Sequence, residues 1–197
     1  MSTITIFQSI TLDGVMQSPG RADEDTRDGF AHGGWAGGYA DEVSMGFAAE
    51  GMSRPGGLLF GRRTYEDLLH AWTTTTGPNP FTDVLVNTHK LVVTRAGAGE
   101  PAYPNTELLV GEAAETVRAR KAQGGDDLTI LGSGELVRAL HAARLIDHYV
   151  VQIHPIVLGS GTKLFGDVDR TDLVLERSLT TTTGVIIAQY AAKHLTG

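Results

Sequence analysis

A short glycine-serine-glycine junction follows an apolar run at residues 128–131, and this junction is suited to binding an anion. The run reads LTIL, Gly132-Ser133-Gly134 follows, and ELVRALHAA continues with helical periodicity. At a helix start, unpaired backbone amides and the positive end of the dipole attract anions, and glycine lets a phosphate approach closely. The dinucleotide pattern GxGxxG is incomplete, because Val137 stands at its third glycine. A tight connection without a ligand is an equally good interpretation.

Two further junctions between an apolar run and the next element combine arginine with threonine. They are Gly61-Arg62-Arg63-Thr64 after the run GLLF, and Thr94-Arg95 after KLVV. Guanidinium groups bind phosphate through paired hydrogen bonds, which suits a pyrophosphate or a ribose 2′-phosphate. A solvated helix start is the alternative for the first junction. Because the carboxyl ends of parallel strands share the edge where open α/β sheets bind ligands, the three junctions together favour a nucleotide site.

Two other patterns have the residue types of catalytic or metal sites but the wrong setting. Ser160 and Lys163 have the SxxK spacing of acyl transferases, which needs one helical turn, but glycines interrupt this segment. His148 and His154 share one face of an expected strand, and at strand spacing they lie about 20 Å apart, too far to share a metal. We therefore expect neither hydrolase chemistry nor a metal site, and we expect solvated or core histidines.

Strands and helices alternate along most of the chain, which indicates crossover connections on a largely parallel sheet. Expected strands are residues 3–12, 57–60, 90–94, 107–110, 127–131, 146–153, 173–182 and 185–192, and expected helices are 41–53, 61–72, 81–88, 112–123 and 135–143. The last two strands join at Thr183-Gly184 as an antiparallel hairpin, so the sheet should be mixed. The acidic, glycine-rich residues 16–38 predict a long functional or mobile loop. The threonine run 73–76 is interpreted as loop and the run 180–183 as strand.

The composition is that of a globular protein, and its length favours one domain over residues 1–197. The difference between 16 basic and 23 acidic side chains gives a net charge of −7, which disfavours binding to nucleic acid or anionic membranes. The chain has no cysteine, which excludes disulfides, thiolate nucleophiles and iron–sulfur clusters. It begins without a basic leader and has no apolar run of about 18 residues, so we expect a cytoplasmic protein.

Five motifs, in order along nearly the whole chain, carry a resemblance to a known family. They are FQSITLDG, LLFGRRTYE, LVVTR, LTILGSGELVRAL and HPIVLGSGTKLF. The chain resembles the dihydrofolate reductase fold family, and more closely the reductases similar to the C-terminal domain of the bifunctional riboflavin-biosynthesis deaminase-reductase. The resemblance implies a three-layer α/β fold around a mixed, mostly parallel sheet. It also implies NADPH along the carboxyl edge and hydride transfer to a pterin-like or pyrimidine-like heterocycle, or to a small carbonyl or imine.

The resemblance further implies roles for individual residues. The family's phosphate-binding helix start matches Gly61, Arg62, Arg63 and Thr64, and its segment that contacts the adenosine 2′-phosphate matches Thr94 and Arg95. Its pyrophosphate turn matches Gly132, Ser133, Gly134, Glu135 and Leu136. Its strand beside the nicotinamide matches Gln8 and Ser9. The nicotinamide is then expected to face Ser9, Asp13, the loop near Trp35 and the segment after His154.

Two departures from the family pattern concern the substrate. The acidic residues 19–30 do not look like the substrate-binding segment of the riboflavin reductases, and the pterin-binding carboxylate has no secure match. Asp41 lies near the expected place of that carboxylate, and Asp13 ends the first strand. Either carboxylic acid, or water, could supply the proton that a reduction needs. The alternatives are a helix N-cap for Asp41 and a turn former for Asp13.

The sequence therefore predicts an NADPH-dependent oxidoreductase of riboflavin-biosynthesis or dihydrofolate reductase type that acts on a small heterocyclic molecule. We expect a homodimer with no metal, nucleic acid or membrane partner. The alternative is a non-catalytic nucleotide-binding or assembly module of the same fold, dimerising through residues 146–153.

Overall fold

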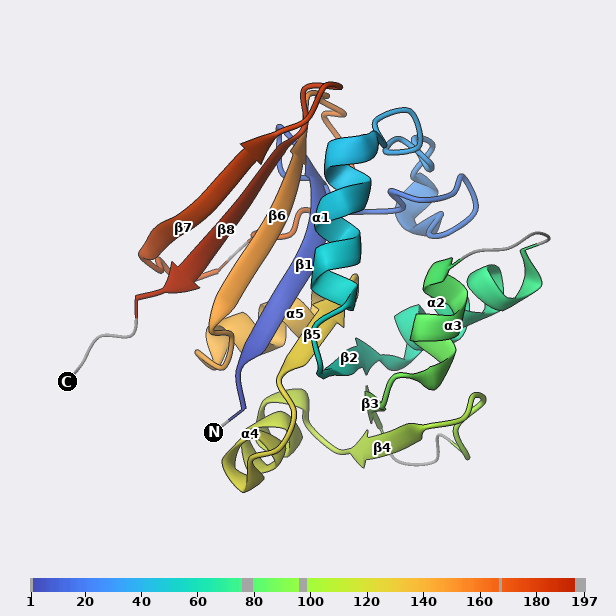
Figure 1. Ribbon diagram of the computed structural model, residues 1–197, viewed down its shortest axis with the longest axis vertical. Coiled ribbons are helices and arrows are strands. Elements are labelled where there is room, and N and C mark those ends of the chain that lie inside the picture. The colour runs from blue at the N-terminus through green and yellow to red at the C-terminus, as the bar shows by residue number, and fades with distance from the viewer. Residues whose placement is uncertain (1, 76–79, 96–98, 167, 194–197) are drawn as a thin grey trace. The chain divides into compact units, whose positions relative to one another are not determined.

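A computed structural model describes residues 2–75, 80–95, 99–166 and 168–193 (Figure 1). The chain forms two compact units, each built from separated stretches of sequence. The first unit comprises Met1–Thr5 and Met52–Ile146, and the second comprises Ile6–Gly51 and Asp147–Gly197. Strand β1 (Ile4–Thr11) begins in the first unit and continues in the second. The single domain expected from the sequence stays a prediction.

The first unit is an α/β structure whose strands are all parallel. Its strands run in the order β4-β3-β2-β5, with the start of β1 beside β5. Their bounds are β2 Gly57–Gly61, β3 Lys90–Thr94, β4 Thr106–Val110 and β5 Leu128–Leu131, and the helices are α2 Arg62–Thr74, α3 Pro80–Asn87, α4 Ala113–Gln123 and α5 Gly134–Ala142. In the sheet Leu59 pairs with Leu91 on one side and with Ile130 on the other.

The core of the first unit combines apolar packing with one buried lysine. Phe60, Tyr65, Leu69, Leu85 and Val92 form a buried cluster. Lys90 is fully buried, and its Nζ donates hydrogen bonds of 2.7–2.9 Å to three backbone carbonyls at the end of α3, namely those of Leu85, Val86 and Thr88. Because the last carbonyls of a helix lack intrahelical partners, this ammonium satisfies groups that would otherwise be buried unpaired. Lys90 therefore fastens α3 to the start of β3.

The second unit is built around antiparallel strands. Its strands run in the order β1-β6-β8-β7, with β6 at His148–His154, β7 at Leu173–Thr180 and β8 at Ile186–Ala192. Strand β8 pairs antiparallel with both β6 and β7. The turn between β7 and β8 contains Gly184 at φ +84°, a conformation that favours glycine. Helix α1 (Glu42–Met52) and the 3-10 helix η1 (Arg27–Gly29) complete this unit.

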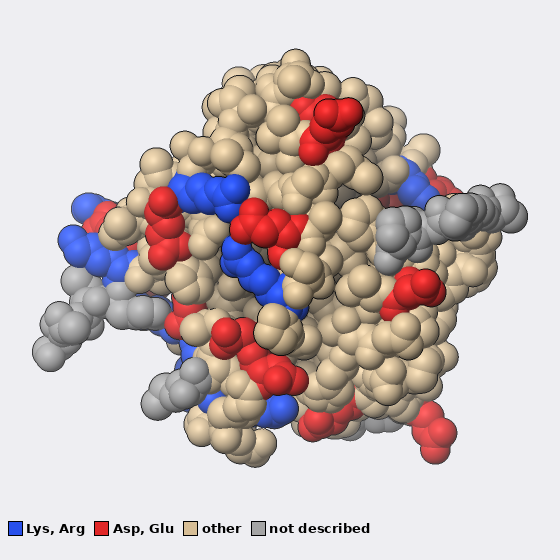
Figure 2. Space-filling model, viewed as in Figure 1, with Lys and Arg blue, Asp and Glu red and all other residues tan. Residues whose placement is uncertain are grey.

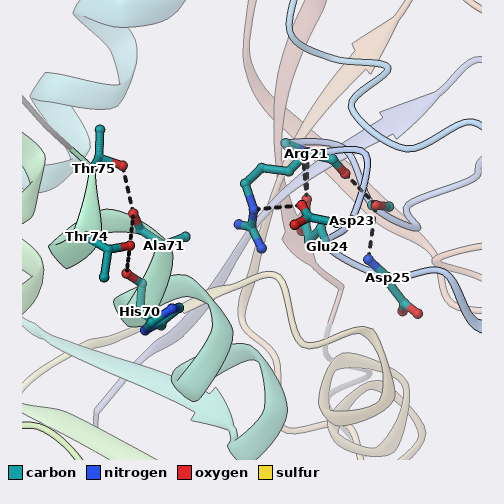
Figure 3. A network of polar contacts seen from close by, with 10 residues as sticks. Arg21, Asp23, Glu24, Asp25, His70, Ala71, Thr74 and Thr75 are labelled. Atoms are coloured by element: carbon teal, nitrogen blue, oxygen red, sulfur yellow. Dashed lines mark hydrogen bonds and ion pairs between the residues drawn. The ribbon is translucent and has the colours of Figure 1, made fainter.

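The predicted α/β fold with a mixed sheet and a C-terminal hairpin is confirmed, since the strands are parallel in one unit and antiparallel in the other. The interpretation of the first threonine run as loop is wrong over residues 73 and 74. Helix α2 continues through Thr74, and the Thr74 hydroxyl donates to the His70 carbonyl at 2.7 Å (Figure 3). Threonine can remain in a helix in this way, because its hydroxyl bonds back one turn. The second run leaves the strand after Thr180 and forms the turn.

The expected loop at residues 16–38 is present, but it is held by many polar contacts. Glu24 Oε2 accepts hydrogen bonds from the amides of Gly20 at 2.7 Å and Arg21 at 3.2 Å, and Arg21 Nε lies 3.3 Å from Asp23 Oδ1 (Figure 3). Phe30 and Trp35 are buried in a cluster with Val15. The acidic residues of this loop therefore serve in part to satisfy its own backbone.

The surface of the described residues carries charges of both signs. On the face shown in Figure 2, basic side chains lie beside acidic ones and form no continuous basic area. None of the described helices is long and apolar enough to cross a membrane.

Candidate functional site

The β2–α2 and β5–α5 junctions meet in the first unit, as the sequence predicts. The amide of Gly61 donates a hydrogen bond of 3.0 Å to Oγ of Ser133. A Cβ added to Gly132 would lie 3.0 Å from Cγ2 of Thr64, so the two turns are in direct contact. Because β2 and β5 are neighbouring parallel strands, both helix starts lie at the same carboxyl edge.

The geometry of Ser133 leaves the start of α5 uncapped. Ser133 is the N-cap residue in a left-handed conformation, with φ 58° and ψ 51°, and its carbonyl accepts the first helical bond from Val137 at 2.9 Å. Its hydroxyl is bound to Gly61, and neither α5 nor α2 has a side-chain cap among the described residues. Both helix starts therefore lack a side-chain cap, and a helix N-terminus of this kind can bind phosphate oxygens.

The three arginines of these junctions differ in ion pairing and in exposure. Arg62 Nε lies 2.6 Å from Glu66 Oε1 in an (i, i+4) ion pair along α2. Arg63 and Arg95 are exposed. Thr94 is buried at the end of β3, and its carbonyl accepts a bond from the Gly111 amide at 2.9 Å. Since β3 is the other neighbour of β2, the Thr94-Arg95 junction lies at the same carboxyl edge as the other two.

The remaining residues of the α5 junction have separate environments. Leu136 is buried, so only its backbone can face a ligand at this site. Glu135 is exposed in the first turn of α5, where a carboxylate interacts favourably with the helix dipole. Gly134 begins the helix. The junction would therefore bind a phosphate mainly through backbone amides.

Gln8 and Ser9, expected beside the nicotinamide, lie on β1 in the second unit. Gln8 is buried, and its Nε2 donates to the Ser9 carbonyl at 3.4 Å. Its Oε1 is buried with no hydrogen-bond partner in the described part of the chain. A buried amide oxygen without a donor is uncommon in folded proteins and marks Gln8 as a residue with spare hydrogen-bonding capacity.

Asp13 is held as a carboxylate by three donors. Oδ1 accepts from the Thr11 hydroxyl at 2.6 Å and from the Leu158 amide at 3.2 Å, and Oδ2 accepts from the Gly159 amide at 2.8 Å. The bond from Thr11, followed by that from Gly159, lowers the pKa of Asp13 to about 2. A carboxylate so stabilised is ionised at neutral pH and has no proton to give. The geometry favours the turn-forming interpretation over the catalytic one.

Asp41 is the N-cap residue of α1. Its Oδ1 accepts from the Ser44 amide at 2.8 Å, and its Oδ2 accepts from both the amide and the hydroxyl of Thr182, at 2.6 and 2.7 Å. The Thr182 hydroxyl and then the Ser44 amide hold the pKa of Asp41 well below its usual range. The N-cap alternative is therefore confirmed, and the hypothesis of a proton donor at Asp41 loses its support.

Sequence reasoning missed Gln17, a buried residue that organises the loop of the second unit. Its Nε2 donates to the carbonyls of Asp25 and Arg27, at 3.2 and 3.1 Å, while its Oε1 accepts from the Thr162 amide at 2.9 Å. Its own carbonyl accepts from Trp35 Nε1 at 2.8 Å. A glutamine in a loop carries no sequence signal for such a role, because its partners come from distant positions.

His154 was expected to be a solvated or core histidine, and it proves to be buried at the end of β6. Neither Nδ1 nor Nε2 has a hydrogen-bond partner among the described residues. The rings of Trp35 and Tyr39 approach it edge to face, with centroids 5.1 and 5.3 Å away. Burial lowers the pKa of His154, so the imidazole is neutral. The loop near Trp35 and the segment after His154 were both expected from the sequence to lie around the nicotinamide, but the contact between the two rings was not predicted.

The two patterns set aside at the outset are resolved by their local structure. Ser160 and Lys163 lie outside any helix, so the SxxK spacing does not bring the two side chains together through a helical turn. His148 Nδ1 lies 3.1 Å from Glu176 Oε2. Over the described ranges, no group of three or more histidine or acidic side chains could hold a metal ion.

These observations define an α/β protein with three glycine- or arginine-containing junctions at the carboxyl ends of parallel strands. Residues 2–187 match the RibD C-terminal domain family, and the chain belongs to that family. The family supports a reductase-type role and an oxidoreductase classification.

The chain is also similar to known proteins in sequence or in structure. The chain is 34% identical to the uncharacterized protein YyaP of Bacillus subtilis over 77 residues, which cover 39% of this chain and 41% of that protein. Its fold is similar to a proposed riboflavin biosynthesis protein from Shewanella sp. PV-4, with a TM-score of 0.72 and 22% identity over 98% of this chain and all of that one.

The fold is also similar to part of a diaminohydroxyphosphoribosylaminopyrimidine deaminase/5-amino-6-(5-phosphoribosylamino)uracil reductase from Thermotoga maritima. That match has a TM-score of 0.63 and 12% identity over 97% of this chain and 56% of the other. At these identities the two solved structures establish the fold alone.

Proposed function

We propose that this protein is an NADPH-dependent reductase that transfers hydride to a small, planar heterocycle of the pyrimidine or pterin type, or to a small carbonyl or imine. The observation that carries the proposal is the bond between Gly61 and Ser133, because it joins two uncapped helix starts at neighbouring strand ends. Two helix dipoles at one sheet edge, at helix starts without a side-chain cap, suit a pyrophosphate.

The residues of the first unit fit the cofactor. Gly132 has φ +63°, and a Cβ at position 132 would press on Thr64, so this turn requires glycine. We assign the pyrophosphate to the turn at residues 132–134 and the 2′-phosphate to Arg63 and Arg95, which are exposed and carry forked donors. Arg62 contributes less, because Glu66 already neutralises part of its charge.

The bound cofactor would supply the hydride, and the protein would supply position and hydrogen bonds. A reduction of a C=N or C=O bond also consumes a proton. Asp13 and Asp41 are both stabilised as carboxylates. We therefore assign the proton to water, which was the third source open from the sequence.

A second candidate, a nucleotide-binding module without catalysis, is favoured by the same two carboxylates. Each is bound to backbone amides and hydroxyls that fix the structure, which leaves neither acid for chemistry. NADPH binding without turnover on any heterocycle or carbonyl would select this alternative. The expected homodimer belongs to either version of the proposal and is tested by sedimentation.

The test of cofactor selectivity uses thermal shift with NADPH and NADH. We expect NADPH to raise Tm more than NADH at equal concentration, because only NADPH carries the 2′-phosphate. Replacing Arg63 and Arg95 with alanine should remove that preference. The control Arg118→Ala removes an exposed charge from α4 of the same unit and should preserve it. A preference for NADPH that survives the double substitution would refute the assignment of those arginines.

A further inference from the structure

The imidazole of His154 is, like Gln8 Oε1, a buried polar group without a hydrogen-bond partner among the described residues. Its side chain is 4% exposed, and both ring nitrogens are inaccessible and unpaired within the described residues. An unpaired buried donor or acceptor costs free energy, since it has lost its hydrogen bonds to water and gained none. Two polar groups near it do have partners: Trp35 Nε1 donates to the Gln17 carbonyl, and the backbone carbonyl of Tyr39 accepts from the Thr183 hydroxyl at 2.7 Å.

The walls around His154 are suited to a flat ring. Trp35 and Tyr39 meet the imidazole at interplanar angles of 87° and 82°. Aromatic rings at this distance pack against planar heterocycles as well as against each other. Because the imidazole is neutral, it keeps one donor and one acceptor nitrogen and offers no positive charge to an anion. These properties select an uncharged planar ring with N–H and C=O groups on its edge.

Of the two covering rings, Tyr39 is the one that can leave. Trp35 is buried and anchored through its indole N–H, whereas Tyr39 is half-buried. A Cβ on the preceding Gly38 would meet nothing within 4 Å. The Tyr39 backbone is held by hydrogen bonds to Ala36 and Thr183, so the displacement is a rotation of the Tyr39 side chain. Moving the tyrosine ring would expose the imidazole and leave the indole as a wall.

We propose that His154 is a ligand-binding residue of the second unit, covered by Tyr39 in the free protein, and that its imidazole hydrogen-bonds an uncharged planar heterocycle that displaces the Tyr39 ring. This proposal rests on the proposed reductase function and names the residue that recognises the reducible ring.

The experiment measures binding of 5-aminouracil to protein saturated with NADP⁺, using calorimetry and the ¹⁵N shifts of the histidine rings. We expect His154→Phe to weaken binding at least about tenfold, because the ligand loses a buried hydrogen bond. Its Tm should equal or exceed that of the wild type, because two unpaired nitrogens are removed. His154→Gln, which keeps a donor and an acceptor, should retain part of the affinity. Tyr39→Ala should bind more tightly than the wild type.

The matched control is His148→Phe, the same change at the other end of β6, where the histidine faces Glu176. It should leave the affinity for 5-aminouracil unchanged. Orotate, which adds a negative charge to the same ring, should bind weakly or not at all. The ring nitrogens of His154 should shift on adding 5-aminouracil and not on adding orotate.

Four results would contradict the proposal. Unchanged affinity in His154→Phe, or no binding of 5-aminouracil to the wild type, would overturn it while NADPH binding stays intact. A lowered Tm or unfolding of His154→Phe would show that the nitrogens hold the fold, and would overturn it equally. Weaker binding in Tyr39→Ala would overturn the covering role. Loss of the NADPH thermal shift in the wild type, by contrast, would remove the proposed function itself.

Discussion

The two units use polar residues at strand ends in opposite ways. In the first unit, the helix starts that follow β2 and β5 have no side-chain cap. The Ser133 hydroxyl accepts a hydrogen bond from Gly61 in the neighbouring turn instead. In the second unit, the polar groups that looked catalytic, Asp13 and Asp41, are each bound by three or more donors. Open backbone groups therefore mark the candidate cofactor site better than acidic side chains do.

The largest effect is expected from Gly132→Val in the first unit. Gly132 has φ +63°, and its Cβ would meet Thr64, so a β-branched side chain is strained and fills the turn. We expect NADPH affinity to fall about 100-fold, because charge-assisted bonds from the turn to the pyrophosphate are lost. Gly124→Val is the control, since Gly124 also has a positive φ but open space around it. Equal loss of NADPH affinity in both variants would contradict the assignment of the pyrophosphate to residues 132–134.

Lys90→Met should lower the free energy of unfolding by about 2 kcal/mol, since three buried or partly buried backbone carbonyls lose a charged donor. Urea denaturation measures the change, with the exposed Lys193→Met as the control. This prediction sharpens the comparison between the two units, because Lys90 is a polar group of the first unit whose role is structural. A stability equal to that of the wild type would show that the helix end is satisfied without Lys90.

The strands, helices and junctions of the first unit could be predicted from the sequence because they depend on local signals. Apolar runs ended by glycine and followed by helical periodicity gave β2, β3 and β5 to within a residue or two, and the parallel order then brings their ends together. The polar contacts of the second unit could not be predicted in this way. Leu158, which donates to Asp13, and Thr162, which donates to Gln17, each lie 145 positions away in sequence, so no local pattern could reveal these bonds.

Asp41→Ala should lower Tm without reducing turnover in any reductase assay, because the residue caps α1 and binds Thr182. The control is Asp126→Ala, an exposed acid of the first unit. Loss of turnover in Asp41→Ala at an unchanged Tm would support a catalytic role for Asp41. It would also contradict the difference between the two units in how their polar groups are used.

Asp13→Asn should show a small, pH-dependent loss of stability. Because the folded pKa of Asp13 is about 2, below the value of 3.8 for the free carboxyl, its contribution is present above about pH 4 and disappears as the pH falls toward 2. The difference in Tm between wild type and variant should therefore shrink over that window. A difference that is constant from pH 7 to pH 2 would show that ionisation of Asp13 does not stabilise the fold.

The most direct test of the cofactor site is amide NMR of the protein titrated with 2′,5′-ADP, the adenosine end of NADPH with its extra phosphate. The account predicts the largest shifts at the amides of residues 62–64, 95 and 133–136, with smaller shifts when 5′-AMP is used. Shifts confined to other elements, or equal responses to both nucleotides, would contradict it.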